Sequence, residues 1–170
     1  MKARQGKWAL RLHLEKEKKV ANPSWDETAM KVVDAYSKRS HCKWFKIGVA
    51  FFRDDRLLVV GYNGSPRGEP HCDKVGCAKE VDGKRLPAGS GLCRGAHAEM
   101  NAIVNAASEG INLKNARVYC TYSPCYSCAK VLVNLPITEF IYKIKYPDED
   151  LRAIELFLRR GIAVRQYKVV

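Results

Sequence analysis

One histidine and two cysteines, far apart in the chain, constrain its fold more than any other feature. His97 is followed two residues later by Glu99, and Cys125 and Cys128 form a Cys-x-x-Cys pair that begins 28 residues downstream (125 − 97). An imidazole and two thiolates are good zinc ligands, and three protein ligands leave the fourth position of a catalytic zinc open for water. The interval has room for one helix, one turn and one strand. The fold must therefore bring the two halves of this pattern together.

His97 stands at the predicted start of a helix. The run that follows leaves little polar surface and predicts a helix buried on all sides; its apolar members are Ala98, Met100, Ala102, Ile103, Val104, Ala106 and Ala107. Gly110 fits the end of this helix. His97 and Glu99 then share the first turn, from which both side chains can reach a site beyond the helix end. Glu99 is not needed as a metal ligand, so it is free to move protons.

Cys125 and Cys128 stand at the predicted start of a second helix. Residues 118–122 are rich in residues that favour strands and predict a buried strand leading to them. Pro124 fits the opening of the helix, where a missing N–H has no partner to lose. The two cysteines are three residues apart and so lie on one face of the first turn. The positive end of the helix dipole favours the thiolate, which is the form that binds zinc.

The order His-x-Glu, then Pro-Cys-x-x-Cys, resembles the pattern of the zinc nucleobase deaminases, and this resemblance implies hydrolytic deamination. Zinc lowers the pKa of a bound water to about 7. Glu99 can accept a proton from that water, protonate a ring nitrogen and later give a proton to departing ammonia. Two other interpretations exist: a Cys-x-x-Cys pair in a reduced protein can be a redox pair, and a buried cysteine is often a small hydrophobic residue. Both halves in this order, each at the start of a predicted helix, favour the metal site.

The composition predicts one domain, at 23–170, preceded by a basic extension at 1–22. The chain has 170 residues, 46% of them hydrophobic, and no apolar run approaches the about 20 residues of a membrane span. Seven cysteines and no secretory signal favour a reducing cytoplasm over a disulfide framework. Residues 1–20 hold seven Lys or Arg against two Glu, within a net charge of +12. Such an arm can bind nucleic acid, but it is more often a solvated helix or frayed terminus, so nucleic acid is not an expected partner.

The remaining elements predict an α/β fold, in which a mixed five-stranded sheet lies between helical layers. They are expected at 24–40 (helix, capped by Ser24), 47–52 and 57–62 (hairpin), 138–142 (strand), 148–160 (helix) and 162–164 (start of a strand). The helix that opens with acids at 148–150 is amphipathic, and its expected inward residues are Leu151, Ile154, Leu156, Phe157 and Leu158. A strand–helix–strand connection of this length makes the last two strands parallel.

Residues 65–95 predict an insertion that holds a second metal. The stretch is rich in Gly, Pro and charge, and a loop of this length needs a reason to be ordered in a compact domain. Soft ligands concentrate in it and just before the hairpin: Cys42, Cys72, Cys77, Cys93 and His71. Any four of these five would suit a structural zinc, and their spacing does not decide which. The alternative is free thiols on a mobile loop. Cys120, inside a predicted strand, is expected in the core.

The sequence resembles the deoxycytidylate (dCMP) deaminases of the cytidine deaminase superfamily over roughly residues 23–168. The zinc pattern is specific to the superfamily. The segments that carry the resemblance are 23–27, 40–43 before 47–48, 61–66, 71–72, 97–102 and 123–128. Two features depart from the family: residues 48–50 read Gly-Val-Ala where Gly-Ala-Val is usual, and the basic extension lies outside the family pattern.

The resemblance implies a three-layer α/β/α fold and the hydrolysis of dCMP to dUMP. It further implies a homohexamer, dCTP and dTTP as effectors, and in some members a second structural zinc. Asn63 matches the family residue that contacts the sugar, and Tyr146 matches a tyrosine of the pocket. Ala98 and Ser123, within the two halves of the zinc pattern, are further candidates for substrate binding.

Three functional hypotheses are compatible with this sequence. The first is a dCMP deaminase whose basic side chains hold the phosphate, with Lys43, Lys46, Arg67 and Lys145 as candidates. The second is a deaminase of bases in tRNA or single-stranded DNA, which the net charge of +12 favours and the lack of an aromatic-basic stripe disfavours. The third is a zinc-stabilised binding module with an inactive site, which the intact pattern disfavours. We therefore expect the first.

Overall fold

The computed structural model describes residues 22–87, 91–146 and 151–168. Residues 1–21 of the predicted basic extension lie outside these ranges, as do the acids at 148–150 that were expected to open a helix. The centre of the fold is a five-stranded sheet in the order β2-β1-β5-β6-β7. Its strands are β1 (Gly48–Arg53), β2 (Arg56–Tyr62), β5 (Arg117–Tyr122), β6 (Glu139–Ile144) and β7 (Ala163–Gln166). None of the described helices is long and apolar enough to cross a membrane.

The sheet is mixed, as predicted. β1 pairs antiparallel with β2 in a hairpin and antiparallel with β5 on its other side. β5 pairs parallel with β6, and β6 pairs parallel with β7. Each parallel step crosses through one helix, because two parallel strands need a long connection. The prediction that the last two strands are parallel is confirmed.

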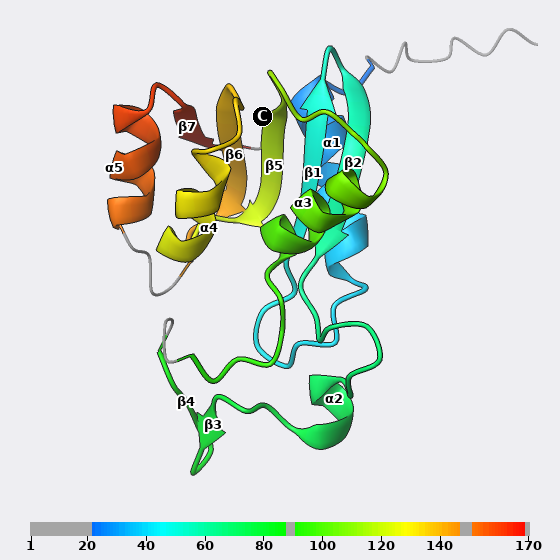
Figure 1. Ribbon diagram of the computed structural model, residues 1–170, viewed down its shortest axis with the longest axis vertical. Helices are drawn as coiled ribbons and strands as arrows, with labels where there is room; N and C mark the ends of the chain where they lie inside the picture. Colours follow the sequence, from blue (N-terminus) through cyan, green and yellow to red (C-terminus); the bar gives the residue numbers. More distant parts are fainter. Residues whose placement is uncertain (1–21, 88–90, 147–150, 169–170) are drawn as a thin grey trace, which may run out of the picture.

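Helices cover both faces of the sheet (Figure 1). α1 (Trp25–Ser37) packs on one face, while α3 (Ala98–Ser108), α4 (Tyr126–Leu132) and α5 (Leu151–Arg159) pack on the other. Successive side chains of β5 alternate between these layers: Tyr119 faces α1, and its neighbours Val118 and Cys120 face the other three helices. The three-layer prediction is therefore confirmed.

The ends of α1 and α3 follow the capping residues of the sequence. The Ser24 hydroxyl accepts a hydrogen bond of 3.1 Å from the Glu27 amide, which satisfies one free donor of α1. α1 ends at Ser37, three residues earlier than expected. Gly110 follows α3 with φ of +66°, a conformation that glycine adopts without strain. The predicted stop of α3 is confirmed.

Two predictions about helix faces are wrong. α3 is not buried on all sides: Met100 is 38% exposed and Val104 is 60% exposed. On α5, Leu151 and Leu158 are 63% and 58% exposed, whereas Phe157 is fully buried. Each helix lies in an outer layer and contacts the sheet along one stripe only, so apolar residues outside that stripe stay in solvent.

The predicted insertion forms a small lobe at one end of the sheet (Figure 1). It contains α2 (Cys72–Val75) and a two-stranded hairpin of β3 (Glu80–Val81) and β4 (Lys84–Arg85). Asp82 and Gly83 form the turn of the hairpin with positive φ angles of 49° and 72°. As expected, this segment is not one regular element.

Gly61 sets the distance between the sheet and α3. A Cβ atom at this position would lie 2.4 Å from the Ala98 carbonyl oxygen and 2.7 Å from the Ala102 amide nitrogen. Both contacts are with main-chain atoms that cannot rotate away. The absence of a side chain therefore lets the first turn of α3 sit directly on β2.

Gly61→Ala is expected to destabilise the fold by about 2–3 kcal/mol, the cost of overpacking a core. The matched control is Gly64→Ala, where the nearest atom to a new Cβ is a Tyr62 ring carbon at 4.0 Å. Urea unfolding of the two variants and the parent chain measures the difference. Equal stability of both variants would show that α3 does not depend on this close approach.

Asp26 joins α1 to the edge of the sheet. Its carboxylate lies 2.7 Å from the Arg165 guanidinium of β7 and accepts a hydrogen bond of 2.8 Å from the Tyr119 hydroxyl. Arg165 also contacts Glu139 on β6 at 2.7 Å. The bond from Arg165 lowers the pKa of Asp26 below its usual value, aided by the bond from Tyr119. The folded state therefore holds the ionised carboxylate more strongly than the unfolded chain does.

Asp26→Asn should lower the free energy of unfolding by about 1 kcal/mol at pH 7, because a charge-assisted bond is lost. A carboxylate with a lowered pKa stabilises the fold above its unfolded pKa of about 3.9, and that contribution disappears as the pH falls through the folded pKa. The difference between the two proteins should thus shrink at pH 3. Glu27→Gln, which changes an exposed acid in the same turn, is the control. A pH-independent difference would contradict the assignment.

Candidate active site

The structure brings His97, Cys125 and Cys128 together at the ends of two helices. His97 is the N-cap residue of α3, and Cys125 is the N-cap residue of α4, with Cys128 in its first turn. Pro124 thus lies just before the cap and not inside the helix, a small correction to the prediction. The ligand atoms of the three residues all lie within 4.8 Å of one another, and no other such group of three occurs among the described residues.

The spacing of these atoms fits a tetrahedral zinc. The His97 Nδ1 atom lies 3.3 Å from the Sγ atoms of both Cys125 and Cys128. Around a zinc ion with Zn–N of about 2.0 Å and Zn–S of about 2.3 Å, nitrogen and sulfur stand about 3.5 Å apart. The three atoms therefore need only small movements to bind one ion.

The electrostatic surroundings of Cys125 also suit a metal ligand. The pKa of the Cys125 thiol is lowered to about 4, because the Cys128 thiol and His97 donate hydrogen bonds to its sulfur. The hydrogen bond with Cys125 raises the pKa of His97. The Cys128 amide also donates to the Cys125 sulfur at 3.4 Å. Cys125 is consequently a thiolate at neutral pH, ready to bind a cation.

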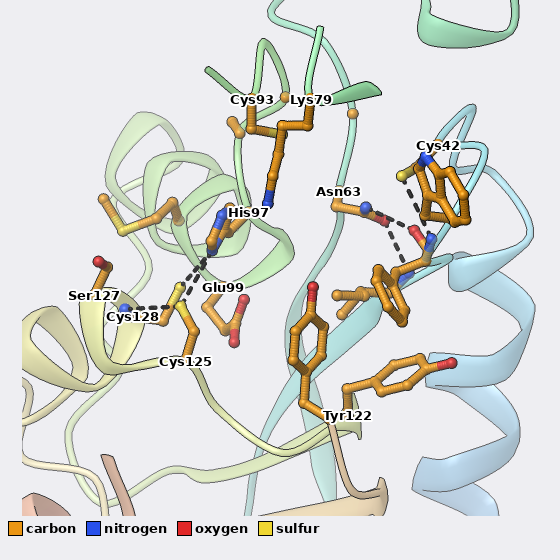
Figure 2. A pocket seen from close by; sticks show the side chains of 18 of the residues that line it. Cys42, Asn63, Lys79, Cys93, His97, Glu99, Tyr122, Cys125, Ser127 and Cys128 are labelled. Carbon is orange, nitrogen blue, oxygen red and sulfur yellow. Dashed lines mark hydrogen bonds between the residues drawn. The ribbon is translucent and has the colours of Figure 1, made fainter. Parts of the chain in front are cut away.

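Glu99 reaches into the same pocket without being part of the trio. It is only 5% exposed, and Figure 2 shows its carboxyl group beside His97, Cys125 and Cys128. Burial raises the pKa of Glu99, and the negative charge of Cys125 raises it further. A carboxyl group whose pKa is moved toward neutrality can both accept and donate a proton during a reaction.

One cavity of about 690 Å³ joins this site to the insertion. Aromatic side chains form part of its wall: the Phe45 ring lies 4.6 Å from Tyr146 and 5.6 Å from Tyr122, between ring centroids. Tyr146 was predicted as a pocket residue, and it lines the cavity. Ser123 also lines it and fixes Tyr146, whose amide donates to the Ser123 hydroxyl at 2.9 Å. The wall thus offers flat apolar surfaces on which a base or sugar can pack.

The other two substrate-binding candidates differ from each other. Asn63 lines the cavity, but its amide group already bonds to the main chain: its oxygen accepts from the Ile47 amide at 2.8 Å, and its nitrogen donates to the Phe45 carbonyl at 2.9 Å. Asn63 therefore holds the segment before β1 in place. Ala98 is fully buried in the core and is not among the residues that line the cavity.

The four cysteines predicted as second-metal ligands line the far part of the same cavity; they are Cys42, Cys72, Cys77 and Cys93. Burial raises the pKa of Cys72, and the negative charges of the other three raise it further. His71, the fifth candidate, stacks on the His41 ring with centroids 4.1 Å apart. The second metal site stays a prediction, because these ligand atoms are not as close together as those of the first group. Cys120 is in the core, as predicted.

Sequence reasoning missed Lys79, which lies in the insertion. Its side chain is only 9% exposed and lines the cavity. Lys43, Lys46, Arg67 and Lys145, the predicted phosphate residues, are not among the residues that line the cavity. Lys43 instead pairs with Glu80 at 3.1 Å. Lys79 belongs to no motif, so only the fold reveals its position.

Comparisons with known proteins agree with this geometry. Residues 23–144 match the cytidine and deoxycytidylate deaminase zinc-binding region. The deoxycytidylate deaminase of Schizosaccharomyces pombe is 33% identical over 145 residues, which are 85% of this chain and 44% of that protein. This chain therefore spans less than half the length of that relative.

Two phage proteins match over nearly their whole length. The deoxycytidylate deaminase of Mycobacterium phage D29 is 32% identical over 136 residues, covering 77% of this chain and all (100%) of that protein. The crystal structure of the dCMP deaminase from cyanophage S-TIM5, in complex with dCMP and dUMP, matches with a TM-score of 0.70 and 26% identity, over 86% of this chain and 98% of that one. With its His–Cys–Cys trio and buried glutamate, this chain thus belongs to the family of cytidine and deoxycytidylate deaminases.

Proposed function

We propose that this protein is an enzyme that hydrolyses dCMP to dUMP and ammonia with the help of zinc. The observation that carries the proposal is the buried carboxyl group of Glu99 beside the His97–Cys125–Cys128 trio. The names of the relatives support the substrate, since both matched sequences are deoxycytidylate deaminases. The aromatic walls of the cavity suit a pyrimidine nucleotide.

His97, Cys125 and Cys128 would hold the zinc ion. Zinc bound there lowers the pKa of a water molecule to about 7 and so supplies hydroxide at neutral pH. The contacts of the His97 Nδ1 atom with both sulfurs at 3.3 Å, and the hydrogen bond from the Cys128 amide to the Cys125 sulfur, hold the three ligands close together before the ion binds. Because the ligand side chains are already ordered in the metal-free protein, binding the metal costs less conformational entropy.

Glu99 would carry the protons. Its carboxylate accepts the proton of the attacking water and donates it to N3 of the cytosine ring while oxygen adds to C4. It then assists the second proton transfer, to the amino group, which leaves C4 as ammonia, and the C4 carbonyl of uracil forms. Burial raises the pKa of Glu99, which brings its proton affinity closer to that of the groups it exchanges with.

We further propose a second, structural zinc in the insertion, bound by four of Cys42, Cys72, Cys77, Cys93 and His71. The shared cavity wall and the mutual charge effects on Cys72 support it. In this proposal residues 23–170 form a single deaminase domain, and the insertion at 65–95 depends on the second metal for its order. All seven cysteines are unpaired, which supports a reducing cytoplasm as the location.

We also propose that copies of the chain associate. Val104 presents apolar surface on the outer side of α3, which is the kind of surface that oligomers cover. A hexamer, and regulation by dCTP and dTTP, are carried forward from the resemblance.

Zinc content should separate the two metal sites. The parent chain is expected to hold two zinc ions, and Cys128→Ala and Cys72→Ala should each hold one, because each removes a ligand of a different site. Cys120→Ala removes a buried cysteine that is not a proposed ligand and should keep both ions. Elemental analysis of the purified proteins measures this. A parent chain with one ion would rule out the second site, and full zinc content in Cys128→Ala would rule out the first.

Turnover should depend on Glu99 and on the nucleotide. The zinc-loaded parent chain is expected to deaminate dCMP, followed by ultraviolet absorbance, and to act far less on deoxycytidine. Glu99→Gln should lower kcat by at least about 100-fold, because it removes the proton carrier, while zinc content stays unchanged. Glu109→Gln, at the exposed C-terminal end of α3, is the matched control. A parent chain inactive on both small substrates would refute the proposal and favour a base within tRNA or single-stranded DNA.

A further inference from the structure

Lys79 is a buried cation that opens on the cavity. The residue is only 9% exposed, and its ammonium group, which is not fully buried, forms no hydrogen bond and no ion pair within the described ranges. Taking an ammonium group out of water costs several kcal/mol unless an acceptor replaces the lost water. A lysine that is largely removed from water, as Lys79 is, therefore gains from an acceptor beside its ammonium group. A partner from outside the chain would explain its position.

The other basic side chains on the cavity wall are already engaged. The Arg85 guanidinium lies 4.9 Å above the Phe45 ring, and the Arg152 guanidinium lies 4.7 Å above the Tyr126 ring. Both also interact with further groups. Figure 2 shows the Lys79 side chain extending from the insertion toward His97, on the side away from Cys125 and Cys128. Lys79 is thus a cation on the cavity wall, beside the three proposed zinc ligands, that can bind an anionic group of a ligand.

The main chain around Lys79 fixes this direction. The Lys79 carbonyl accepts a hydrogen bond of 2.7 Å from the Leu86 amide, which closes the base of the β3–β4 hairpin. The next amide, that of Glu80, donates to the Cys77 carbonyl at 3.0 Å. The Glu80 carboxylate, the nearest acid in sequence, is held by Lys43 at 3.1 Å and does not neutralise Lys79. The hairpin therefore fixes the main chain from which the Lys79 side chain reaches the cavity.

We propose that Lys79 binds the phosphate group of the nucleotide, so that the insertion carries the subsite that distinguishes a nucleotide from a nucleoside. This inference rests on the proposed function, since it assigns a residue to the substrate of that site. A phosphate dianion can accept several hydrogen bonds from one ammonium group, and the attraction is stronger in a partly closed cavity than in water. A nucleoside has no charge to offer at this point. Lys79 is accordingly a specificity residue and not a proton carrier.

The test compares binding of the products dUMP and deoxyuridine, which differ only in the phosphate, to the zinc-loaded full chain by calorimetry. Lys79→Met should weaken dUMP binding by about 10- to 100-fold, the usual effect of losing one charge-assisted hydrogen bond, and leave deoxyuridine binding unchanged. Lys79→Arg should retain most of the dUMP affinity. Lys84→Met removes an exposed lysine from the same hairpin and should bind like the parent chain. Inorganic phosphate should compete with dUMP in the parent chain but not in Lys79→Met.

The outcomes separate this inference from the proposed function. Equal loss of dUMP and deoxyuridine binding in Lys79→Met would overturn the inference, because it would indicate a structural role. Unchanged dUMP binding, or a parent chain that binds both products equally, would overturn it as well. If Lys79→Met does not fold, Lys79→Gln, which keeps a polar end, gives the same comparison. A parent chain that binds phosphate through Lys79 but does not deaminate dCMP would refute the proposed function and leave the phosphate site standing.

Discussion

The meeting of two helix N-termini at one end of the sheet is the constraint on which the rest of the structure depends. His97 is the N-cap residue of α3 and Cys125 is the N-cap residue of α4, and β5 lies between the two helices in the chain. A helix start leaves amide groups without internal partners, and its partial positive charge favours a thiolate nearby. Here the Cys128 amide donates to the Cys125 sulfur. The same local structure therefore ends the strand, caps the helix and prepares a metal ligand.

The packing of α3 on β2 makes this meeting possible. Gly61 has no side chain, so the main chain of β2 approaches the Ala98 carbonyl and the Ala102 amide closely. The close contact fixes the first turn of α3, which holds His97 and Glu99. The insertion then closes the cavity from the other side and adds Lys79 and three cysteines, Cys72, Cys77 and Cys93, to its wall. The proposed catalytic zinc ligands and the proposed phosphate contact thus come from different parts of the chain.

The sequence predicted most of the fold because local signals agreed with each other. Ser24, Gly110 and Gly161 stood at helix ends, and the hairpin of β1 and β2 was bounded by a polar turn. The trio and Glu99 were also predictable, since their identity and order depend on chemistry and not on packing. What could not be predicted was which apolar residues lie outside the contact stripe of a helix, as Val104 and Leu158 do.

Long-range positions were the other failure, and the cavity shows why. Asn63, predicted to contact a sugar, lines the cavity, and the structure adds that its amide bonds to the main chain at Ile47 and Phe45, sixteen and eighteen residues away. Lys79 was not considered, because its sequence neighbours resemble those of any exposed lysine in a charged loop. Only the folded hairpin turns it inward. Contacts of this kind depend on which distant residues a segment packs against in the fold. The pattern of apolar residues along the segment does not predict those tertiary contacts.

The most direct test of this account is a crystal structure of the zinc-loaded protein with anomalous scattering measured at the zinc absorption edge. We expect a peak bonded to the His97 Nδ1 atom and to the Cys125 and Cys128 Sγ atoms, at about 2.0 Å from nitrogen and about 2.3 Å from sulfur, with a water or hydroxide in the fourth position beside Glu99. A peak absent from this place, or a fourth protein ligand that closes the site, would contradict the account.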